Sequence, residues 1–199
     1  MPSSSHIPIL ETERLLLRPF SDGDITAWYA IYSDEEANTF LPWYPVKSLE
    51  EADGLFREEL AAASKDSAGY RYAVCLKADN IPIGYIVVSS GESHDFGYGL
   101  RKEFWHQGIT TEASSAVVEL LRKDGVPFIT ATHDVNNPRS GNVMKNIGMI
   151  YCYSYEELWQ PKNIVVTFRM YQLNLDGQND RVYQKYWETC NIHFIEKEI

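Results

Sequence analysis

A strand, a glycine loop and a helix follow one another without a break in residues 95–113, which read DFGYGLRKEFWHQGITTEA. The apolar residues after Gly108 recur at helical spacing, so the helix begins directly after the loop. Backbone N–H groups at such a helix start have no partner within the helix and attract anions. Arg101, Lys102 and His106 add positive charge nearby. The segment predicts a diphosphate site, although a plain strand-to-helix connection would also explain one glycine.

The rest of the chain alternates between strand and helix patterns. Ser21 with Asp24, Ser48 with Glu51, and Asn137 before proline are typical helix starts. Strand patterns cover residues 10–20, 70–76, 81–89, 94–101, 128–133, 150–159 and 164–175, and helical patterns begin at residues 21, 48, 108, 137 and 180. We therefore expect an α/β fold, with a mixed, mostly antiparallel central sheet flanked by helices. We expect one domain over residues 1–199, with residues 176–199 as a C-terminal helical extension.

The charge balance limits the partners. The formal net charge is −10, which argues against nucleic acid because phosphate binding needs a basic face. Residues 34–66 hold nine acidic residues against three basic ones, which either steer a cationic amine or form a solvated helix face. No apolar run is long enough for a membrane span, and residues 1–6 lack a signal-peptide pattern. Cys75, Cys152 and Cys190 are too far apart for a zinc site, so we expect free thiols and a cytoplasmic protein.

Several motifs occur in an order that resembles the GNAT superfamily of N-acetyltransferases, and more closely its RimJ/RimL-like ribosomal-protein branch. Residues 95–100 (DFGYGL) match the strand motif of that branch, and Trp105, Gly108, Thr111, Glu112 and Ala113 match its loop and helix start. Residues 11–20 resemble the opening T-E-R-L-x-L-R-P-F, and residues 137–149 resemble the later N-x-x-S…G-F/M motif. The resemblance covers residues 9–172 and implies the GNAT fold, acetyl-CoA as co-substrate and no metal.

The sequence departs from this pattern at a few positions. Thr110 replaces a glycine or alanine of the phosphate loop, and His106 replaces a small residue. Neither change removes a backbone N–H group, so acetyl-CoA binding is still expected. Met144 occupies the place of a tyrosine general acid, and Asp95 stands where glutamate is more usual. The missing tyrosine keeps a non-catalytic CoA-binding sensor domain as an alternative to an enzyme.

The resemblance also implies residue roles. Asp95 matches a glutamate base, with His94 as the neighbouring candidate, and Ser140 is the nearest motif hydroxyl to the leaving thiolate. Acetyl-CoA contacts are implied for Gly99, Leu100, Arg101, Lys102, Gln107, Gly108, Ile109, Thr110, Thr111 and Asn137.

Independently of the resemblance, Glu112 in the first helical turn reads as structural, and alternation along the strand predicts that Tyr98 points toward the core. A catalytic pair of His133 and Asp134 is not favoured, because neighbours on a strand face opposite ways. Arg139 either meets a CoA phosphate or faces solvent, and solvent is the preferred interpretation.

Phe40, Trp43 and Tyr44 lie in an irregular aromatic stretch that the resemblance places beside the acceptor. These residues have two possible roles. They either bind the acceptor or cover the sheet as hydrophobic packing. The expected acceptor is a protein α-amino group, with a small cationic amine such as a polyamine or an antibiotic as the alternative. The expected reaction is direct attack in a ternary complex, by a monomer or a homodimer.

Overall fold

The computed structural model describes residues 7–63 and 69–199 of the chain. The signal-peptide inference concerned residues 1–6, which lie outside the described residues, as do Lys65 and Asp66 of the acidic stretch.

Five antiparallel strands form the N-terminal sheet, in the order β1-β2-β3-β4-β5. These are β1 (Leu10–Glu11), β2 (Leu15–Arg18), β3 (Tyr70–Leu76), β4 (Pro82–Val88) and β5 (Phe96–Leu100). Alternate side chains such as Leu15, Leu17 and Ile86 enter the main core and are almost fully buried. The expected hairpin over residues 70–89 is confirmed as β3 and β4.

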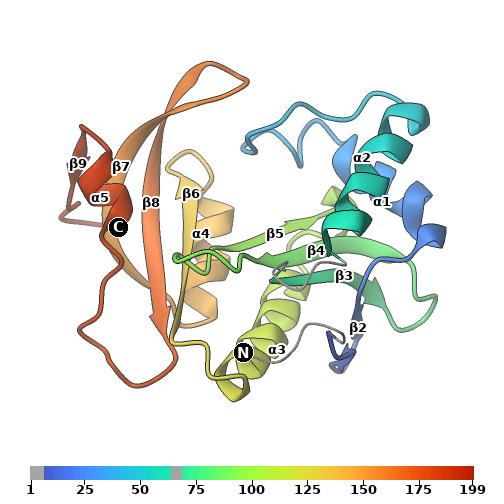
Figure 1. The fold of residues 1–199 in the computed structure, drawn as a ribbon, viewed down its shortest axis with the longest axis horizontal. Coiled ribbons are helices and arrows are strands. Elements are labelled where there is room, and N and C mark those ends of the chain that lie inside the picture. Colours follow the sequence, from blue (N-terminus) through green and yellow to red (C-terminus); the bar gives the residue numbers. More distant parts are fainter. Residues whose placement is uncertain (1–6, 64–68) are drawn as a thin grey trace.

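Four more antiparallel strands form a second sheet, in the order β6-β8-β7-β9. These are β6 (Phe128–Asp134), β7 (Ile150–Trp159), β8 (Ile164–Asn174) and β9 (His193–Phe194). An isolated parallel bridge between Asp95 and Thr130 joins the two sheets. Beyond this bridge β5 and β6 diverge, as Figure 1 shows.

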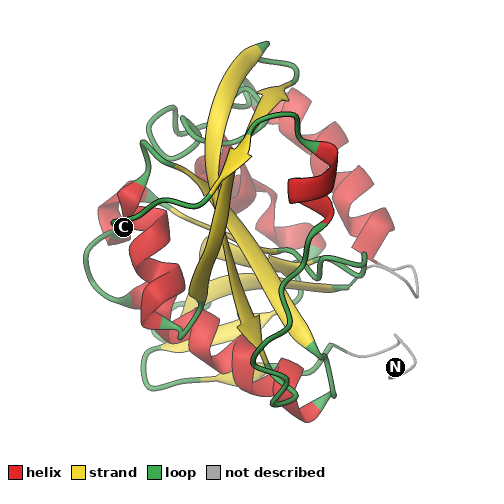
Figure 2. Ribbon diagram, turned by 90° about the vertical axis from the view of Figure 1, so that its left-hand side faces the viewer, coloured by secondary structure: helices red, strands yellow, loops and turns green. Residues whose placement is uncertain are grey.

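Helices lie on both sides of the strands (Figure 2). They are α1 (Ile25–Tyr32), α2 (Leu49–Ala63), α3 (Ile109–Lys123), α4 (Pro138–Asn146) and α5 (Lys185–Thr189), with short 3-10 turns at Asp22–Asp24 and Lys102–Phe104. Ala113, Val117 and Leu121 follow the expected helical spacing and attach α3 to the main core. Trp28 of α1 and Phe56 of α2 form a separate cluster. The expected α/β arrangement is thereby confirmed.

Two predicted elements need correction. The strand expected over residues 10–20 is a short hairpin, because Thr12 N–H donates to Leu15 O (3.0 Å) and Leu15 N–H donates back to Thr12 Oγ1 (3.0 Å). The helix expected over residues 180–187 begins only at Lys185. Side chains of β8 hold the preceding segment out of a helix, since Gln172 Nε2 donates to Arg181 O (2.8 Å) and Tyr183 N–H donates to Gln172 Oε1 (2.7 Å).

An aromatic stack joins α1 to the N-terminal sheet and depends on a glycine of β5. Trp28 stacks on Tyr32 with ring centroids 4.1 Å apart, and Tyr32 stacks on Tyr85 at 5.3 Å. Gly99 lies directly opposite Tyr85 in the register. A Cβ atom at Gly99 would lie 2.4 Å from the Tyr85 ring. Any larger residue at this position must therefore displace the stack.

Gly99→Ala is expected to destabilise the fold by about 1–3 kcal/mol, because the buried Tyr85 ring cannot move away without disturbing Tyr32. Gly97→Ala on the same strand is the matched control, since a Cβ there meets no atom within 4 Å. Urea unfolding of both variants measures the difference. Equal stability of the two variants would contradict this account of Gly99.

Candidate active site

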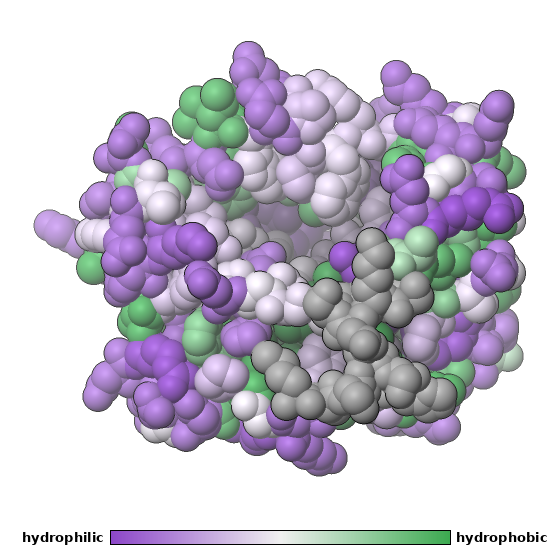
Figure 3. Space-filling model, in the orientation of Figure 1, coloured by the Kyte–Doolittle hydropathy of each residue, from purple (hydrophilic) through white to green (hydrophobic). Residues whose placement is uncertain are grey.

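The divergence of β5 and β6 leaves backbone groups facing a gap between the two sheets. Arg101 N–H donates to Ile83 O and Ser89 N–H donates to Asp95 O, both at 2.9 Å, so the odd-numbered residues of β5 pair with β4. In an antiparallel pair the residues between them point their N–H and C=O groups the other way. The backbone groups of Tyr98 therefore face β6 across the gap. Figure 3 shows the surface hollowed near its centre, between the side that carries β6–β8 and the side that carries α1 and α2.

The start of α3 lies beside β5 and is built as the sequence predicts. Gly108 is the N-cap residue and has φ 72°, a left-handed conformation that glycine adopts without strain. Glu112 N–H donates to Gly108 O (3.0 Å), so the helical ladder begins there. The N–H groups of Ile109, Thr110 and Thr111 precede that first bond and have no acceptor within the helix. This geometry suits a diphosphate.

Residues of the opening hairpin hold this helix start in place. Arg14 Nε donates to Glu112 Oε2 (2.7 Å), and Arg14 Nη1 donates to Gln107 O (2.9 Å). Partial burial opposes the ionisation of Glu112, but hydrogen bonds from Thr12 and Arg14 outweigh it and lower the pKa of that carboxyl. The opening motif and the helix start thus form one unit, and Glu112 has the structural contacts expected of it.

The basic residues near the loop are largely paired. Arg101 forms an ion pair with Glu103, and Lys102 Nζ lies 3.8 Å from Asp34 Oδ2. Arg139 was expected to face solvent; it is exposed, and its guanidinium also lies 5.0 Å from the centre of the Trp105 ring. Trp105 Nε1 in turn donates to Leu100 O (2.8 Å), which ties the loop to the end of β5. An anion at this loop would therefore meet backbone N–H donors, whereas the positive charges of Arg101 and Lys102 are already paired.

Asp95 stands where the two sheets meet. It forms the backbone bridge with Thr130, and Thr130 Oγ1 donates to Ser93 O (2.9 Å). Burial raises the pKa of the Asp95 carboxyl to about 6, well above that of an ordinary aspartate. His94 has φ 45° and packs edge-on against Phe128, with ring centroids 5.3 Å apart. Of the two candidate bases, Asp95 thus lies at the junction of the sheets, and His94 packs against Phe128 of β6.

Ser140 lies in the first turn of α4, where Asn137 Oδ1 accepts a hydrogen bond from its N–H group (3.4 Å). The Tyr98 hydroxyl donates to Ser140 O (2.7 Å) and lies 2.9 Å from Ser140 Oγ. Sequence reasoning assigned Tyr98 to the core, and its ring does pack there, but its hydroxyl reaches α4. Burial raises the pKa of Tyr98. Met144 is 1% exposed in the main core and contributes no polar group.

The aromatic residues at 40–44 lie on the loop between α1 and α2. Trp43 Nε1 donates to Asn38 Oδ1 (3.0 Å), and the Trp43 ring lies 6.0 Å from that of Tyr32. Phe40 is partly buried and Tyr44 is exposed. Lys162, in the turn between β7 and β8, donates to Thr39 O (2.9 Å). This contact joins the aromatic loop to the turn between β7 and β8.

Other sequence candidates have no catalytic geometry. His133 Nδ1 lies 2.8 Å from the backbone oxygen of Asp134, not from its carboxylate, so the two do not form a catalytic pair. Cys75, Cys152 and Cys190 are free thiols. Among residues 7–63 and 69–199, no cluster of His, Cys, Asp or Glu could hold a metal ion. No helix in the same ranges is long and apolar enough to cross a membrane.

Known proteins are similar to this chain in sequence or in fold. The uncharacterized N-acetyltransferase YnaD of Bacillus subtilis (strain 168) is 30% identical over 148 residues, which are 70% of this chain and 81% of that protein. The structure of RimL, a ribosomal L7/L12 alpha-N-protein acetyltransferase in complex with coenzyme A, superposes with a TM-score of 0.72 at 19% identity, over 86% of this chain and 100% of RimL.

A spermidine N-acetyltransferase from Vibrio cholerae, in complex with CoA and spermine, gives a TM-score of 0.69 at 14% identity, over 82% of this chain and 97% of that one. At such identities the structures show the shared fold and leave the acceptor open. The model of the acetyltransferase (GNAT) domain matches residues 14–150, which include β2, the α3 start and α4. The chain therefore belongs to the GNAT family of acetyltransferases.

Proposed function

We propose that this N-acetyltransferase moves the acetyl group from acetyl-CoA directly to an amine held beside Asp95. The observation that carries the proposal is the gap between β5 and β6, with Asp95 at one end of it and the α3 start beside it. A diphosphate group fits the N–H groups of Ile109, Thr110 and Thr111. The backbone of Tyr98 then faces the extended arm of the co-substrate across the gap.

Individual contacts follow from where each residue lies. The proposed acetyl-CoA contacts remain Gly99, Leu100, Arg101, Lys102, Asn137 and residues 107–111. Gly99 and Arg101 pair with β4 through their backbones, so the backbone of Tyr98 between them is the closer partner on β5. Thr110 lies in the first turn of α3, where its hydroxyl adds a donor for a phosphate oxygen.

The proposed chemistry needs a base and a good leaving group. An amine with a pKa near 10 is mostly protonated at neutral pH, so a proton must be removed before the nitrogen attacks the thioester carbonyl. The Asp95 carboxylate takes one proton from the ammonium group and passes it to solvent. The neutral nitrogen then attacks, the N–C bond forms as the C–S bond breaks, and the thiolate leaves with the electron pair. The second proton on the nitrogen passes to that thiolate and gives the CoA thiol. Ser140 and Tyr98 hydroxyls lie near each other for hydrogen bonding to that thiolate. A thiol pKa near 8.5 makes the thiolate a fair leaving group even without full protonation.

The proposed acceptor is a protein α-amino group, on the motif resemblance to the RimJ/RimL-like branch. A small cationic amine is the second candidate, favoured by the acidic residues around Asp95, which include Glu92 and Glu157. We also propose a cytoplasmic location and a monomeric or homodimeric state, which gel filtration tests.

Asp95→Asn is expected to lower kcat by about ten- to a thousand-fold, because the amide cannot accept the proton. The wild-type kcat should rise as the pH increases through about 6, where Asp95 ionises, and the variant should lose this limb. The Tm at pH 7.5 should not fall, since the variant removes a half-buried carboxylate whose charged form is disfavoured by that burial.

Asp180→Asn, an exposed carboxylate in the segment after β8, is the control for this test. Initial rates against a panel of amines and N-terminal peptides, from pH 5.5 to 9, provide the measurement. An Asp95→Asn enzyme with wild-type kcat across this range would refute Asp95 as the base. Tight binding of CoA without turnover of any amine would favour the sensor alternative.

Gly108→Glu is expected to abolish acetyl-CoA binding, because a carboxylate would enter the space meant for the diphosphate. Gly108→Ala is the matched control, since it carries the same backbone strain at φ 72° without the charge. Calorimetry with CoA should show a larger loss of affinity for the glutamate variant than for the alanine variant. Equal affinity of the two variants would show that the diphosphate binds elsewhere.

A further inference from the structure

The chain after β8 returns to the second sheet. Residues 176–199 lie beyond the part that the GNAT domain model matches. The Tyr153 hydroxyl donates to Tyr183 O (2.6 Å), and Tyr186 of α5 stacks on Tyr155 of β7, with ring centroids 5.1 Å apart and an interplanar angle of 11°. An ion pair between Arg169 and Glu196 and the pairing of β9 with β7 fix the end of the segment.

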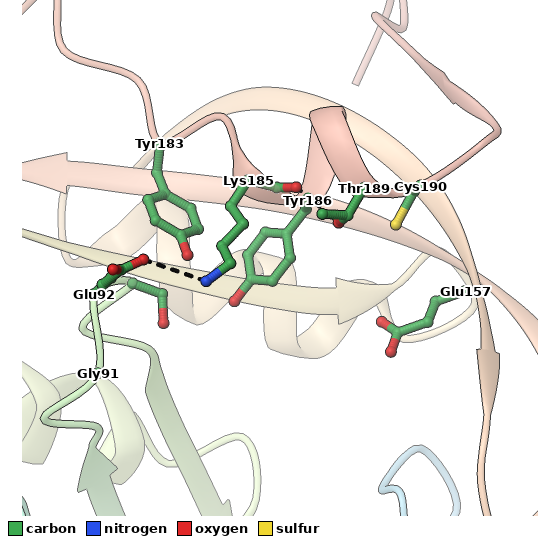
Figure 4. A pocket seen from close by; sticks show the side chains of 9 residues that line it. Gly91, Glu92, Glu157, Tyr183, Lys185, Tyr186, Thr189 and Cys190 are labelled. Atoms are coloured by element: carbon green, nitrogen blue, oxygen red, sulfur yellow. Dashed lines mark hydrogen bonds and ion pairs between the residues drawn. The ribbon is translucent and has the colours of Figure 1, made fainter.

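A cavity of about 600 Å³ lies between this segment and the turn before β5 (Figure 4). The turn supplies Glu92 and Ser93, β7 supplies Glu157, and the C-terminal segment supplies Tyr183, Tyr186 and Cys190. The cavity is therefore made jointly by the turn before β5, by β7 and by the C-terminal segment.

The cavity adjoins the proposed reaction centre. Burial raises the pKa of Tyr186 to about 12, and its hydrogen bonds with Ser93 and Thr130 oppose this rise. Thr130 is the residue that bridges to Asp95, and Ser93 is two residues before Asp95. The negative charge of Asp95 also contributes to the raised pKa values of Tyr155, Tyr183 and Tyr186. Tyr186 of α5 thus lies next to the point where the two sheets meet.

The lining suits a positive charge. Glu157 is exposed and has no ion pair among the residues that the structure describes. Glu92 pairs with Lys185 at 3.2 Å, but these side chains are 79% and 58% exposed, so a competing cation can replace the lysine at little cost. Tyr183 and Tyr186 meet edge to face, with ring centroids 5.3 Å apart. Tyrosine faces beside carboxylates attract ammonium and guanidinium groups.

We infer that this cavity binds a second positive charge of the acceptor, beyond the amine that receives the acetyl group, with Glu157 and Tyr186 as specificity-determining residues. This inference rests on the proposed function, because it takes Asp95 as the place of the reacting amine. The chemistry is shared by aliphatic diamines and by peptides with lysine or arginine after the N-terminal residue.

The test compares acceptors that differ only in the second charge. These are 1,4-diaminobutane against n-butylamine, and an N-terminal Ala-Lys peptide against its Ala-Gln counterpart. The wild-type kcat/KM should favour the charged member of at least one pair by about tenfold. Glu157→Gln and Tyr186→Leu should each remove most of that preference without changing the KM for acetyl-CoA. A preference within the amine pair identifies a diamine as the acceptor, and a preference within the peptide pair identifies a basic peptide.

Glu119→Gln, an exposed carboxylate on α3, is the control and should keep the preference. Because Tyr186→Leu removes a packed ring, the thermal unfolding of this variant is measured in parallel. If it is unfolded, the test rests on the Glu157→Gln variant alone. Equal kcat/KM within both wild-type pairs would overturn the cavity assignment while leaving acetyl transfer intact.

Equilibrium binding of the same amines to the protein saturated with CoA separates the two proposals. Binding of the charged acceptor that depends on Glu157, without turnover of any amine, would support the cavity and defeat the proposed function. Binding that is indifferent to the Glu157→Gln change would defeat the cavity.

Discussion

The backbone bridge between Asp95 and Thr130 is the constraint on which the site depends. If β5 and β6 paired along their whole length, the two sheets would be continuous and no gap would exist between them. Because they diverge beyond the bridge, the backbone groups of Tyr98 face a space where another molecule can pair with them. The same bridge fixes Asp95 at the apex of the gap, where burial raises the pKa of its carboxyl to about 6. The position of Asp95 in the gap and the raised pKa of its carboxyl thus both follow from the bridge to Thr130.

Local sequence signals predicted the elements around this site well. The glycine loop and α3, the Asn137 cap of α4 and the hairpin of β3 and β4 lie where the residue patterns indicate. Each of these depends on neighbouring residues, such as a capping side chain or a glycine with positive φ. The apolar spacing of α3 also identified the residues that reach the core.

Contacts between distant segments could not be read from such patterns. The link from Arg14 to Glu112, the hydroxyl contact of Tyr98 with Ser140 and the stacking of Tyr186 on Tyr155 each join parts of the chain that only the fold brings together. The start of α5 was misplaced for the same reason, because side chains of β8 hold the residues before it. Alternation along β5 placed the Tyr98 ring correctly and gave no sign of where its hydroxyl ends.

Three separate segments outside β5 and α3 carry aromatic or acidic side chains. They are the aromatic loop pinned by Lys162, the turn before β5, and the C-terminal segment with its tyrosines. The matched GNAT domain contains β5, the α3 start, the aromatic loop and the turn before β5, whereas the C-terminal segment lies beyond the matched residues. Under the proposed function, the acidic and tyrosine side chains of the turn before β5 and of the C-terminal segment select the amine.

Amide hydrogen exchange with and without acetyl-CoA tests the role of the gap most directly. Calorimetry first establishes the concentration at which the protein is saturated. The account predicts slower exchange at Tyr98 of β5 and at Ile109, Thr110 and Thr111 of α3, because these N–H groups would then bond to the co-substrate. Saturation that leaves these amides unchanged and protects another part of the chain would contradict it.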